Sequence, residues 1–215
     1  MKLQDLVRHR HDHEDGGGTI DHPRAYEVMA EIGFAGRRLL VFTQIAALAG
    51  VRPGERVLDV GCGTGYLTRV LSPLAGPEGR VTGLDPAPAM IDHARRRAPA
   101  NCVYQTGEGQ ALPFSDGSFD LVVCSLAVHH MPVAARADAM REMFRVVRPG
   151  GRLLVAEFRP PANPLGARVA DVLAGPAMRQ PMPELLAALI PDAGFRVEST
   201  GRLKPLLWYA RAIRP

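Results

Sequence analysis

Several residue types and patterns are scarce in this sequence, and each scarcity excludes a class of protein. Of its 215 residues only three are cysteines, Cys62, Cys102 and Cys124. They form no C-x-x-C pair, so we expect reduced thiols rather than a disulfide framework. No apolar run approaches the roughly 20 residues that a membrane span needs, and the start lacks the apolar core of a signal peptide. We therefore expect a cytoplasmic protein with no membrane span.

Lysine is nearly absent as well, because Lys2 and Lys204 are the only lysines. The net charge of +4 and the pI of about 9.3 come from scattered arginines rather than from a basic patch. We therefore expect no nucleic-acid partner. The length and the hydrophobic content of 47% fit one globular domain.

The first fifty residues fall into two parts. Residues 1–20 contain alternating histidines flanked by acids and then three consecutive glycines, a composition that predicts a disordered tail. Such a tract could ligate a transition metal, but it usually does so adventitiously, so we expect no functional metal. Residues 21–50 predict two helices, Arg24–Ile32 and Arg37–Leu48, of which the second ends at Gly50.

The most informative stretch runs from Val57 to Leu67. A short apolar run containing Asp59 passes into a turn with Gly61, Gly63 and Gly65, and helical spacing follows. The dinucleotide fingerprint G-x-G-x-x-G does not fit, because the third glycine comes one residue early. A carboxylate beside the turn would repel a pyrophosphate but could accept a hydrogen bond from an ammonium group, directly or through water. The expected ligand therefore carries a positive end.

This stretch resembles motif I of the class I S-adenosylmethionine-dependent methyltransferases, whose cofactor has an ammonium, a sulfonium and no phosphate. A second predicted strand, Arg80–Asp85, ends in an acid 26 positions beyond Asp59. A Rossmann-type unit places near this point the carboxylate that takes ribose hydroxyls. The alternative is that Asp85 caps the next predicted helix, Pro88–Arg97.

Two further segments carry the resemblance. Residues 107–114 read G-E-G-Q-A-L-P-F, which resembles the G-D-A-x-x-L-P-F loop of ubiquinone/menaquinone-type methyltransferases (methyltransferase type 11). In that family the acid accepts a hydrogen bond from the adenine amino group, and the next backbone N–H donates one to a ring nitrogen. The resemblance implies these roles for Glu108 and Gly109. Glutamate in place of aspartate lengthens the reach by one methylene, and a loop acid facing solvent is the alternative. The R-P-G-G turn at residues 148–151, before a predicted strand Arg152–Glu157, also resembles the family.

The candidate reacting groups follow the predicted strand Phe119–Ser125. His129 and His130 come just after its carboxyl end, where open α/β sheets bind ligands, so we predict that they are catalytic. Orienting loops by hydrogen bonding is the alternative role. The resemblance implies S-adenosyl-L-methionine as cofactor, and the predicted cofactor-binding residues are Tyr26, Asp59, Gly61, Cys62, Gly63, Gly65, Asp85, Pro86, Met90, Glu108, Gly109, Gln110, Ser125 and Leu126.

The fold that the resemblance implies is an α/β Rossmann-like methyltransferase fold. Its seven-stranded, mostly parallel sheet has helices on both faces and an antiparallel last strand at the edge. Residues 51–215 form this domain, with an insertion at 160–178 as a partial lid that contains a short helix, Ala167–Leu173. The remaining predicted elements are strands Cys102–Thr106, Phe195–Thr200 and Leu206–Ile213 and helices Val133–Val147 and Pro183–Ala193.

We expect residues 21–50 to form the main lid over the methyl acceptor. Tyr26, Met29, Ile32 and Phe34 are the candidate lining residues, and Tyr26 is expected to close over the cofactor. The alternative is that these helices pad one face of the sheet.

The predicted function is methyl transfer from S-adenosylmethionine to O or C of a small, largely apolar metabolite, quinone-like or from secondary metabolism. Positioning the acceptor can supply about 7–11 kcal/mol of the barrier, so no base is required by the chemistry itself. No N-P-P-Y sequence follows the fourth strand and no RNA-binding domain is appended, which favours a small-molecule acceptor. Two alternatives remain: a methyltransferase-like enzyme with a non-methylating reaction, and a non-catalytic S-adenosylmethionine-binding partner protein.

Overall fold

The computed structural model describes residues 22–159, 181–203 and 207–215. The predicted tail 1–20 and the insertion 160–178 with its helix Ala167–Leu173 lie outside these residues. The helices are α1 Pro23–Gly33, α2 Arg38–Ala49, α3 Tyr66–Ala75, α4 Pro88–Arg95, α5 Arg136–Val146 and α7 Met182–Asp192. The strands are β1 Arg56–Val60, β2 Arg80–Asp85, β3 Cys102–Thr106, β4 Phe119–Ser125, β5 Val147–Phe158, β6 Arg196–Leu203 and β7 Leu207–Ile213.

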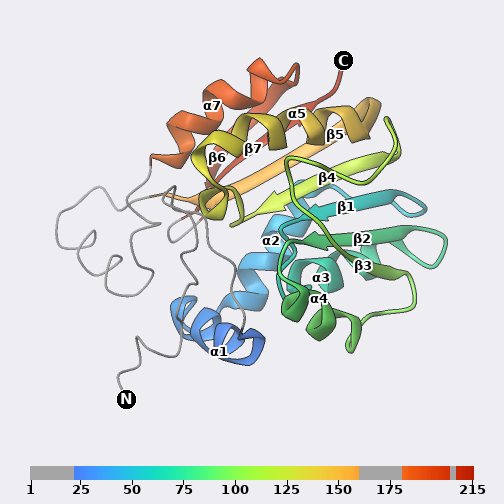
Figure 1. Cartoon of the computed structure of the whole chain (residues 1–215), viewed down its shortest axis with the longest axis vertical. Helices are drawn as coiled ribbons and strands as arrows, with labels where there is room; N and C mark the ends of the chain where they lie inside the picture. Colours follow the sequence, from blue (N-terminus) through green and yellow to red (C-terminus); the bar gives the residue numbers. More distant parts are fainter. Residues whose placement is uncertain (1–21, 160–180, 204–206) are drawn as a thin grey trace.

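The strands form one seven-stranded sheet in the order β3-β2-β1-β4-β5-β7-β6, which Figure 1 shows from the green edge to the red one. β3, β2, β1, β4 and β5 run parallel to one another, and β7 is antiparallel to both of its neighbours. The predicted fold class is therefore confirmed, including the antiparallel last strand.

The predicted edge position of that last strand is wrong. After α7 the chain does not form β6 next to β5 but leaves one strand position free between them. β7 then occupies this position, between β5 and β6. Among the described strands β7 has hydrogen-bonding partners on both sides, whereas β6 has a partner on one side only. The residues of β6 are accordingly half-buried or exposed along its whole length.

The R-P-G-G segment also differs from its prediction as a turn. It lies within β5, which begins at Val147, and the pairing with β4 shifts register between Val147 and Arg152. Gly150 takes a positive φ of 71°, and a Cβ on Gly151 would lie 2.6 Å from a methyl carbon of Val147. The two glycines therefore let the strand bulge without ending it. Smaller differences are that α4 ends at Arg95, and that the predicted helix from Val133 starts with a 3₁₀ turn, Val133–Ala135, before α5.

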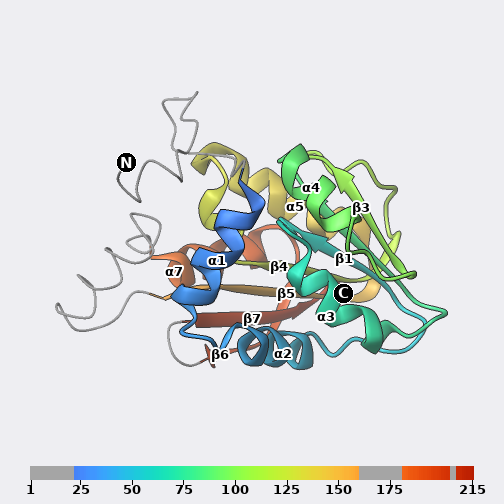
Figure 2. The same cartoon turned by 90° about the horizontal axis from the view of Figure 1, so that it is seen from below.

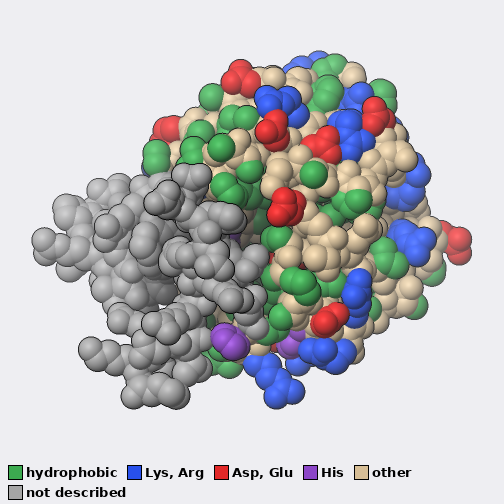
Figure 3. Space-filling view, viewed as in Figure 1, with side chains coloured by type: hydrophobic (Ala, Val, Ile, Leu, Met, Phe, Trp, Pro, Cys, Tyr) green, Lys and Arg blue, Asp and Glu red, His purple; other side chains and the backbone are tan. Residues whose placement is uncertain are grey.

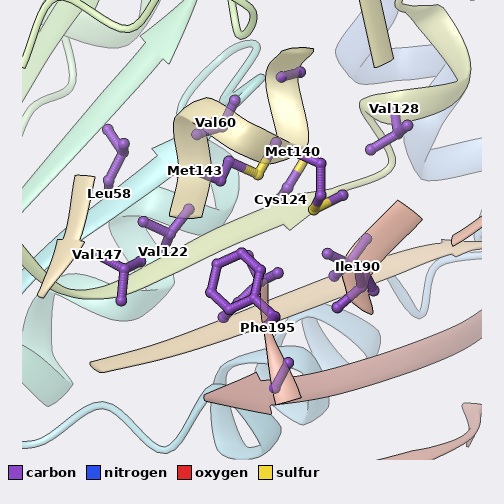
Figure 4. Close-up of a cluster of buried hydrophobic side chains, with 14 of the residues drawn as sticks. Leu58, Val60, Val122, Cys124, Val128, Met140, Met143, Val147, Ile190 and Phe195 are labelled. Atoms are coloured by element: carbon purple, nitrogen blue, oxygen red, sulfur yellow. The ribbon is translucent and has the colours of Figure 1, made fainter. Parts of the chain in front are cut away.

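Helices cover both faces of the sheet and form two cores. On one face the side chains of α5 and α7 pack against the sheet, and Figure 4 shows Met140 and Met143 of α5 pointing at the strand that carries Val122 and Cys124. On the other face α2 and α3 lie side by side, as Figure 2 also shows, with α4 near the β3 edge. Because both faces are covered, the central strands are apolar almost throughout, as parallel strands are.

The two N-terminal helices have different environments. α2 buries Val41, Phe42 and Ile45 against the second core, so this helix pads a sheet face, as the alternative interpretation held. No residue of α1 is fully buried, although Tyr26 is partly buried, and the helix contacts α4. Its assignment as a lid stays a prediction. No single helix among the described residues has the length and hydropathy of a membrane span; α1 and α2 meet that criterion only together, and they are bent by 88° at the break between them.

Candidate active site

The glycine turn is bound to the neighbouring strand by its backbone. The N–H groups of Gly61 and Cys62 both donate to the carbonyl oxygen of Leu84, at 2.8 and 3.0 Å. Gly107, which begins the loop after β3, donates to the carbonyl of Asp85 at 3.1 Å. The carboxyl ends of β1, β2 and β3 are thereby brought together at one end of the sheet, where open α/β folds bind ligands.

The three glycines of the turn serve different purposes. All have positive φ, but a Cβ on Gly61 would lie 2.3 Å from the Cβ of Ala127, and one on Gly65 would lie 2.6 Å from the Tyr104 hydroxyl. These two glycines are therefore required by packing within the protein. A Cβ on Gly63 would meet nothing within 4 Å. Of the three, Gly63 is the one whose missing side chain leaves room for a ligand to approach the backbone.

Asp85 joins the turn to the next helix. Its carboxylate accepts the Gly63 N–H at 2.8 Å and the Ala87 N–H at 3.0 Å, one on each oxygen. Burial raises the pKa of this carboxyl, and the two backbone hydrogen bonds oppose the rise. Each oxygen keeps an unused lone pair, so the group can still take a vicinal diol. Asp85 supports α4 through Ala87, its N-cap residue, and the ribose role stays a prediction.

Asp59 lies deeper than the sequence suggests. It is only 1% exposed and accepts a hydrogen bond from the Thr68 hydroxyl at 2.7 Å. Burial raises the pKa of Asp59 to about 7, with the charge of Asp85 adding to the rise. Thr68 lies two residues into the helical stretch after Tyr66, and nothing in the sequence marks it as a partner of Asp59.

α1 brings Tyr26 to this end of the sheet. Burial raises the pKa of the Tyr26 phenol; the positive charge of Arg38 opposes the rise and the negative charge of Asp85 adds to it. The neighbouring residue, Glu27, holds α1 in place. Its carboxylate lies 2.9 Å from Arg97 and 3.8 Å from each of Arg38, Arg69 and His93, which belong to α2, α3 and α4.

Arg38 is a candidate site residue that the sequence reasoning did not propose. Its side chain is almost fully buried, its guanidinium carbon lies 3.8 Å from the centre of the Tyr66 ring, and its Nε has no hydrogen-bond partner among the described residues. A buried guanidinium with an unused donor beside the glycine turn could hold a carboxylate, which the methionine part of S-adenosylmethionine carries. Its position after Arg37, at the start of an apolar helix, gave no sign of this burial.

The remaining predicted cofactor residues are unevenly placed. Gly109 is buried, and a Cβ there would lie 3.0 Å from Met131. Glu108 is exposed and accepts a hydrogen bond from the Gln110 amide at 2.7 Å. Glu108 therefore faces solvent, and its contact with adenine stays a prediction. Pro86 is exposed, whereas Cys62 and Met90 are buried.

The end of β4 carries backbone strain. Leu126 has a φ of +56°, which costs a residue with a Cβ about 1–2 kcal/mol. Its N–H donates to the carbonyl of Ala156 at 2.8 Å, and this bond fixes the strained turn. The hydroxyl of Ser125 just before it is buried with no partner among the described residues. A strained turn with an unused hydroxyl at this end of the sheet fits a ligand-binding position.

The predicted histidines follow this turn, and one of them has a buried acidic partner. Nδ1 of His129 lies 2.7 Å from Oε2 of Glu157, and both side chains are at most 3% exposed. The other oxygen of Glu157 accepts the Val128 N–H at 2.8 Å. The His130 ring lies 4.0 Å from the His129 ring, centre to centre. Glu157 was not predicted, although its position at the end of β5 is analogous to that of Asp85 at the end of β2.

The described residues fit S-adenosylmethionine. Gly63 leaves space against the backbone, Asp85 has free acceptor capacity, Asp59 is a buried acid beside the turn, and Arg38 offers an unused donor. A seven-stranded sheet of this order, with such a site at its carboxyl end, defines a class I S-adenosylmethionine-dependent methyltransferase.

Comparisons with known proteins agree. A family model described as a methyltransferase domain matches residues 57–151. The ubiquinone/menaquinone biosynthesis C-methyltransferase UbiE of Ectopseudomonas mendocina is 34% identical over 218 aligned positions, which cover 88% of this chain and 84% of that protein. Its counterpart from Hahella chejuensis is 43% identical over 129 positions, 58% of this chain and 51% of that protein.

Solved structures show the same fold. A S-adenosylmethionine-dependent methyltransferase from Aquifex aeolicus superposes with a TM-score of 0.71 at 20% identity, over 90% of this chain and 99% of that one. The chain belongs to the class I S-adenosylmethionine-dependent methyltransferases, in the ubiquinone/menaquinone-type branch. It is an enzyme that transfers a methyl group from S-adenosylmethionine to a small molecule.

The different surroundings of the glycines lead to a first prediction. Gly63→Val should abolish S-adenosylmethionine binding, because the side chain fills ligand space, and backbone strain should cost about 1–2 kcal/mol of stability. Gly61→Ala should lose more stability than this, because its Cβ also overlaps Ala127. Calorimetric titration and thermal unfolding measure the two effects.

A control separates strain from ligand contact. Gly54 has a φ of +85° with nothing within 4 Å of an added Cβ, and it lies in the turn before β1. Gly54→Val should match Gly63→Val in stability and bind the cofactor normally. If Gly63→Val also binds normally, the turn does not face the cofactor.

The buried Asp59 leads to a second prediction, on pH. Because the folded-state pKa of about 7 lies above the ordinary value of 3.8, the folded protein holds a proton that the unfolded chain releases. Its contribution to stability therefore falls as the pH rises from about 4 to about 7. Ionised Asp59 attracts an ammonium group, so affinity for S-adenosylmethionine should rise about tenfold from about pH 6 to about pH 8.

Asp59→Asn is the control for this pH dependence. The affinity of both proteins is measured by calorimetry in the same buffers. Titration of the cofactor itself affects both measurements equally, so it cancels in the comparison. The pH dependence should be smaller in Asp59→Asn, and an identical dependence in the two proteins would show that Asp59 does not sense the ammonium.

Proposed function

We propose that this enzyme methylates a ring carbon of a small hydroxylated aromatic compound of the quinol type. The relatives named as ubiquinone/menaquinone C-methyltransferases support the substrate class. The observation that carries the proposal is the buried pair of His129 and Glu157 beside the cofactor turn. Ala127, two residues before His129, lies against Gly61.

The pair has the arrangement of an oriented base. A carboxylate accepts hydrogen bonds only, so Nδ1 of His129 is the donor to Glu157, and in the neutral ring this tautomer leaves the lone pair on Nε2. Arg136, itself buried, donates to the carbonyl oxygens of His129 and Met131, which fixes the backbone of this segment. The Phe158 ring, 5.5 Å from the His129 ring, adds an apolar aromatic surface.

Such a base suits carbon methylation of a phenolic ring. Nε2 of His129 takes the hydroxyl proton, which raises the electron density on the ring carbon beside the oxygen. S-adenosylmethionine, when bound, supplies a sulfonium methyl group, and the carbon–sulfur electron pair stays with sulfur. The ring carbon gains the methyl group and loses its hydrogen as a proton, and the ring oxygen regains the proton held by His129. The net products are therefore the methylated ring, S-adenosylhomocysteine and one proton.

A direct assay tests the proposed substrate class. The enzyme is given S-adenosylmethionine with a ¹³C-labelled methyl group and a short-tailed quinol that has an open ring position beside a hydroxyl. We expect S-adenosylhomocysteine by mass detection and a labelled methyl carbon bonded to the ring by NMR. A label on oxygen would contradict carbon methylation. Cofactor binding without S-adenosylhomocysteine from any phenolic acceptor would contradict the function.

The role of His129 gives a separate prediction. His129→Ala should lower kcat by about 10²–10⁴-fold, as removal of a general base does, with the S-adenosylmethionine Kd unchanged. Glu157→Gln can still accept from Val128 but loses the charge that orients His129, so kcat should also fall. His130→Ala is the matched control and should lose less. If His130→Ala loses more than His129→Ala, the base is assigned to the wrong histidine.

A further inference from the structure

Exposed large apolar side chains are concentrated on one short part of the described chain. The described residues include seven such side chains, and five of them, Val28, Met29, Ile32, Leu39 and Leu40, lie on α1 and the first turn of α2. Their exposed fractions run from 41% for Met29 to 66% for Ile32. Single exposed apolar residues are ordinary, but a run of five within 13 residues needs an explanation. We call these five residues the apolar lid face.

The helical positions give α1 two faces. Tyr26 and Ala30, four residues apart, share the face nearer the sheet domain, where Tyr26 feels the charge of Asp85. Val28 and Ile32, also four apart, share a face about half a turn away. Because Val28 points away from Tyr26, packing of α1 onto the cofactor site does not cover it.

Exposed positive charge surrounds this face. Arg24 on α1, Arg37 just before α2 and Arg96 at the end of α4 are exposed, and none of them forms an ion pair with another described residue. The exposed acid on α1 is Glu31, while Glu27 is engaged by Arg97. In Figure 3 several basic side chains lie along the lower edge of the molecule, the end at which α1 and α4 lie in Figure 1, and others lie at the right and upper edges.

An apolar face bordered by arginines is the pattern of a helix that lies in the surface of an anionic bilayer. Spanning is excluded by the packing, because α2 is built into the core through Val41, Phe42 and Ile45. The 88° bend between the helices likewise opposes a continuous span. The only parts of the pair that a bilayer can receive are therefore the outward side chains.

We propose that the apolar lid face docks on an anionic lipid surface. Three residues of the docked face, Val28, Met29 and Ile32, lie on the same helix as Tyr26, so docking brings the bilayer surface next to the predicted lid of the cofactor site. The docking proposal rests on the proposed function and adds a route for the substrate. A quinol with an apolar tail partitions into the bilayer, and a lid that lies at the bilayer surface receives it without passage through water.

The test is flotation of the purified full chain with vesicles, without any acceptor. One vesicle type is phosphatidylcholine alone and the other contains phosphatidylglycerol as well. We expect binding to the anionic vesicles and much weaker binding to the neutral ones. Absence of binding to both would overturn the proposal.

Two sets of substitutions locate the binding surface. The triple variant Val28→Ser, Leu39→Ser and Leu40→Ser should bind anionic vesicles at least about tenfold more weakly. The triple variant Arg24→Gln, Arg37→Gln and Arg96→Gln should lose on the order of 100-fold, from about fivefold for each arginine. Leu74→Ser, which removes an exposed leucine on α3, is the matched control and should bind as the unmodified protein does. Equal binding by the control and both triple variants would overturn the proposal.

Two further measurements test whether the apolar lid face binds something other than lipid. Turnover of the short-tailed quinol should be unchanged in the serine triple variant, and its loss would mean that the face lines the acceptor pocket. Sedimentation should give the same mass for the variant and the unmodified protein; a dimer that the serine substitutions dissociate would assign the face to a second copy. Vesicle binding without quinol methylation would refute the proposed function alone, and methylation without vesicle binding would refute the docking alone.

Discussion

The buried carboxylate of Asp85 is the contact on which the arrangement of the site depends. It fixes the Gly63 N–H and the Ala87 N–H at once, and thereby joins the turn after β1 to the start of α4. Desolvation is a cost to this group, and its raised pKa expresses that cost. The protein keeps the charge there because two backbone donors offset part of the penalty. A polar ligand that offers further donors would offset more, which is why an acid is tolerated at the buried end of an apolar strand.

Much of the cofactor half could be predicted from the sequence because its signals are local. Apolar runs that end in Asp85 or Ser125, and glycines at fixed spacing, specify a strand, a turn and a helix within a few residues. The placement of β7 was beyond such signals, since Leu207–Ile213 pairs with β5 some fifty positions earlier and its alternating pattern fits an edge or an inner strand equally well. The prediction of a turn at R-P-G-G was wrong for a related reason, because the same glycine pattern in the sequence fits a turn and a bulge.

The sequence suggested positions for the site residues but not their pairings, and their roles stay predictions. His129 was proposed for its place after β4, but its partner Glu157 lies 28 residues further on, and only the parallel pairing of β4 with β5 brings them together. The burial of Asp59 against Thr68 and the burial of Arg38 depend likewise on how helices pack on the sheet. A side chain's type and neighbours in sequence say what it can do, whereas its pKa and its available donors are set by residues that are distant in the chain.

The position of β7 inside the sheet has a consequence for how the protein is made. β1 to β4 can pair while later residues are still being synthesised, but among the described strands β6 has no hydrogen-bonded neighbour until β7, which follows it in the chain, is available. Arg214, just after β7, then donates to the carbonyls of Phe144, Arg145 and Val147 and lies over the Phe144 ring. The cofactor half thus consists of contacts between parts of the chain that emerge early, and the half that carries Glu157 is closed by residues that emerge much later. A ribosome-bound chain can therefore assemble the glycine turn before β5 has its second neighbour.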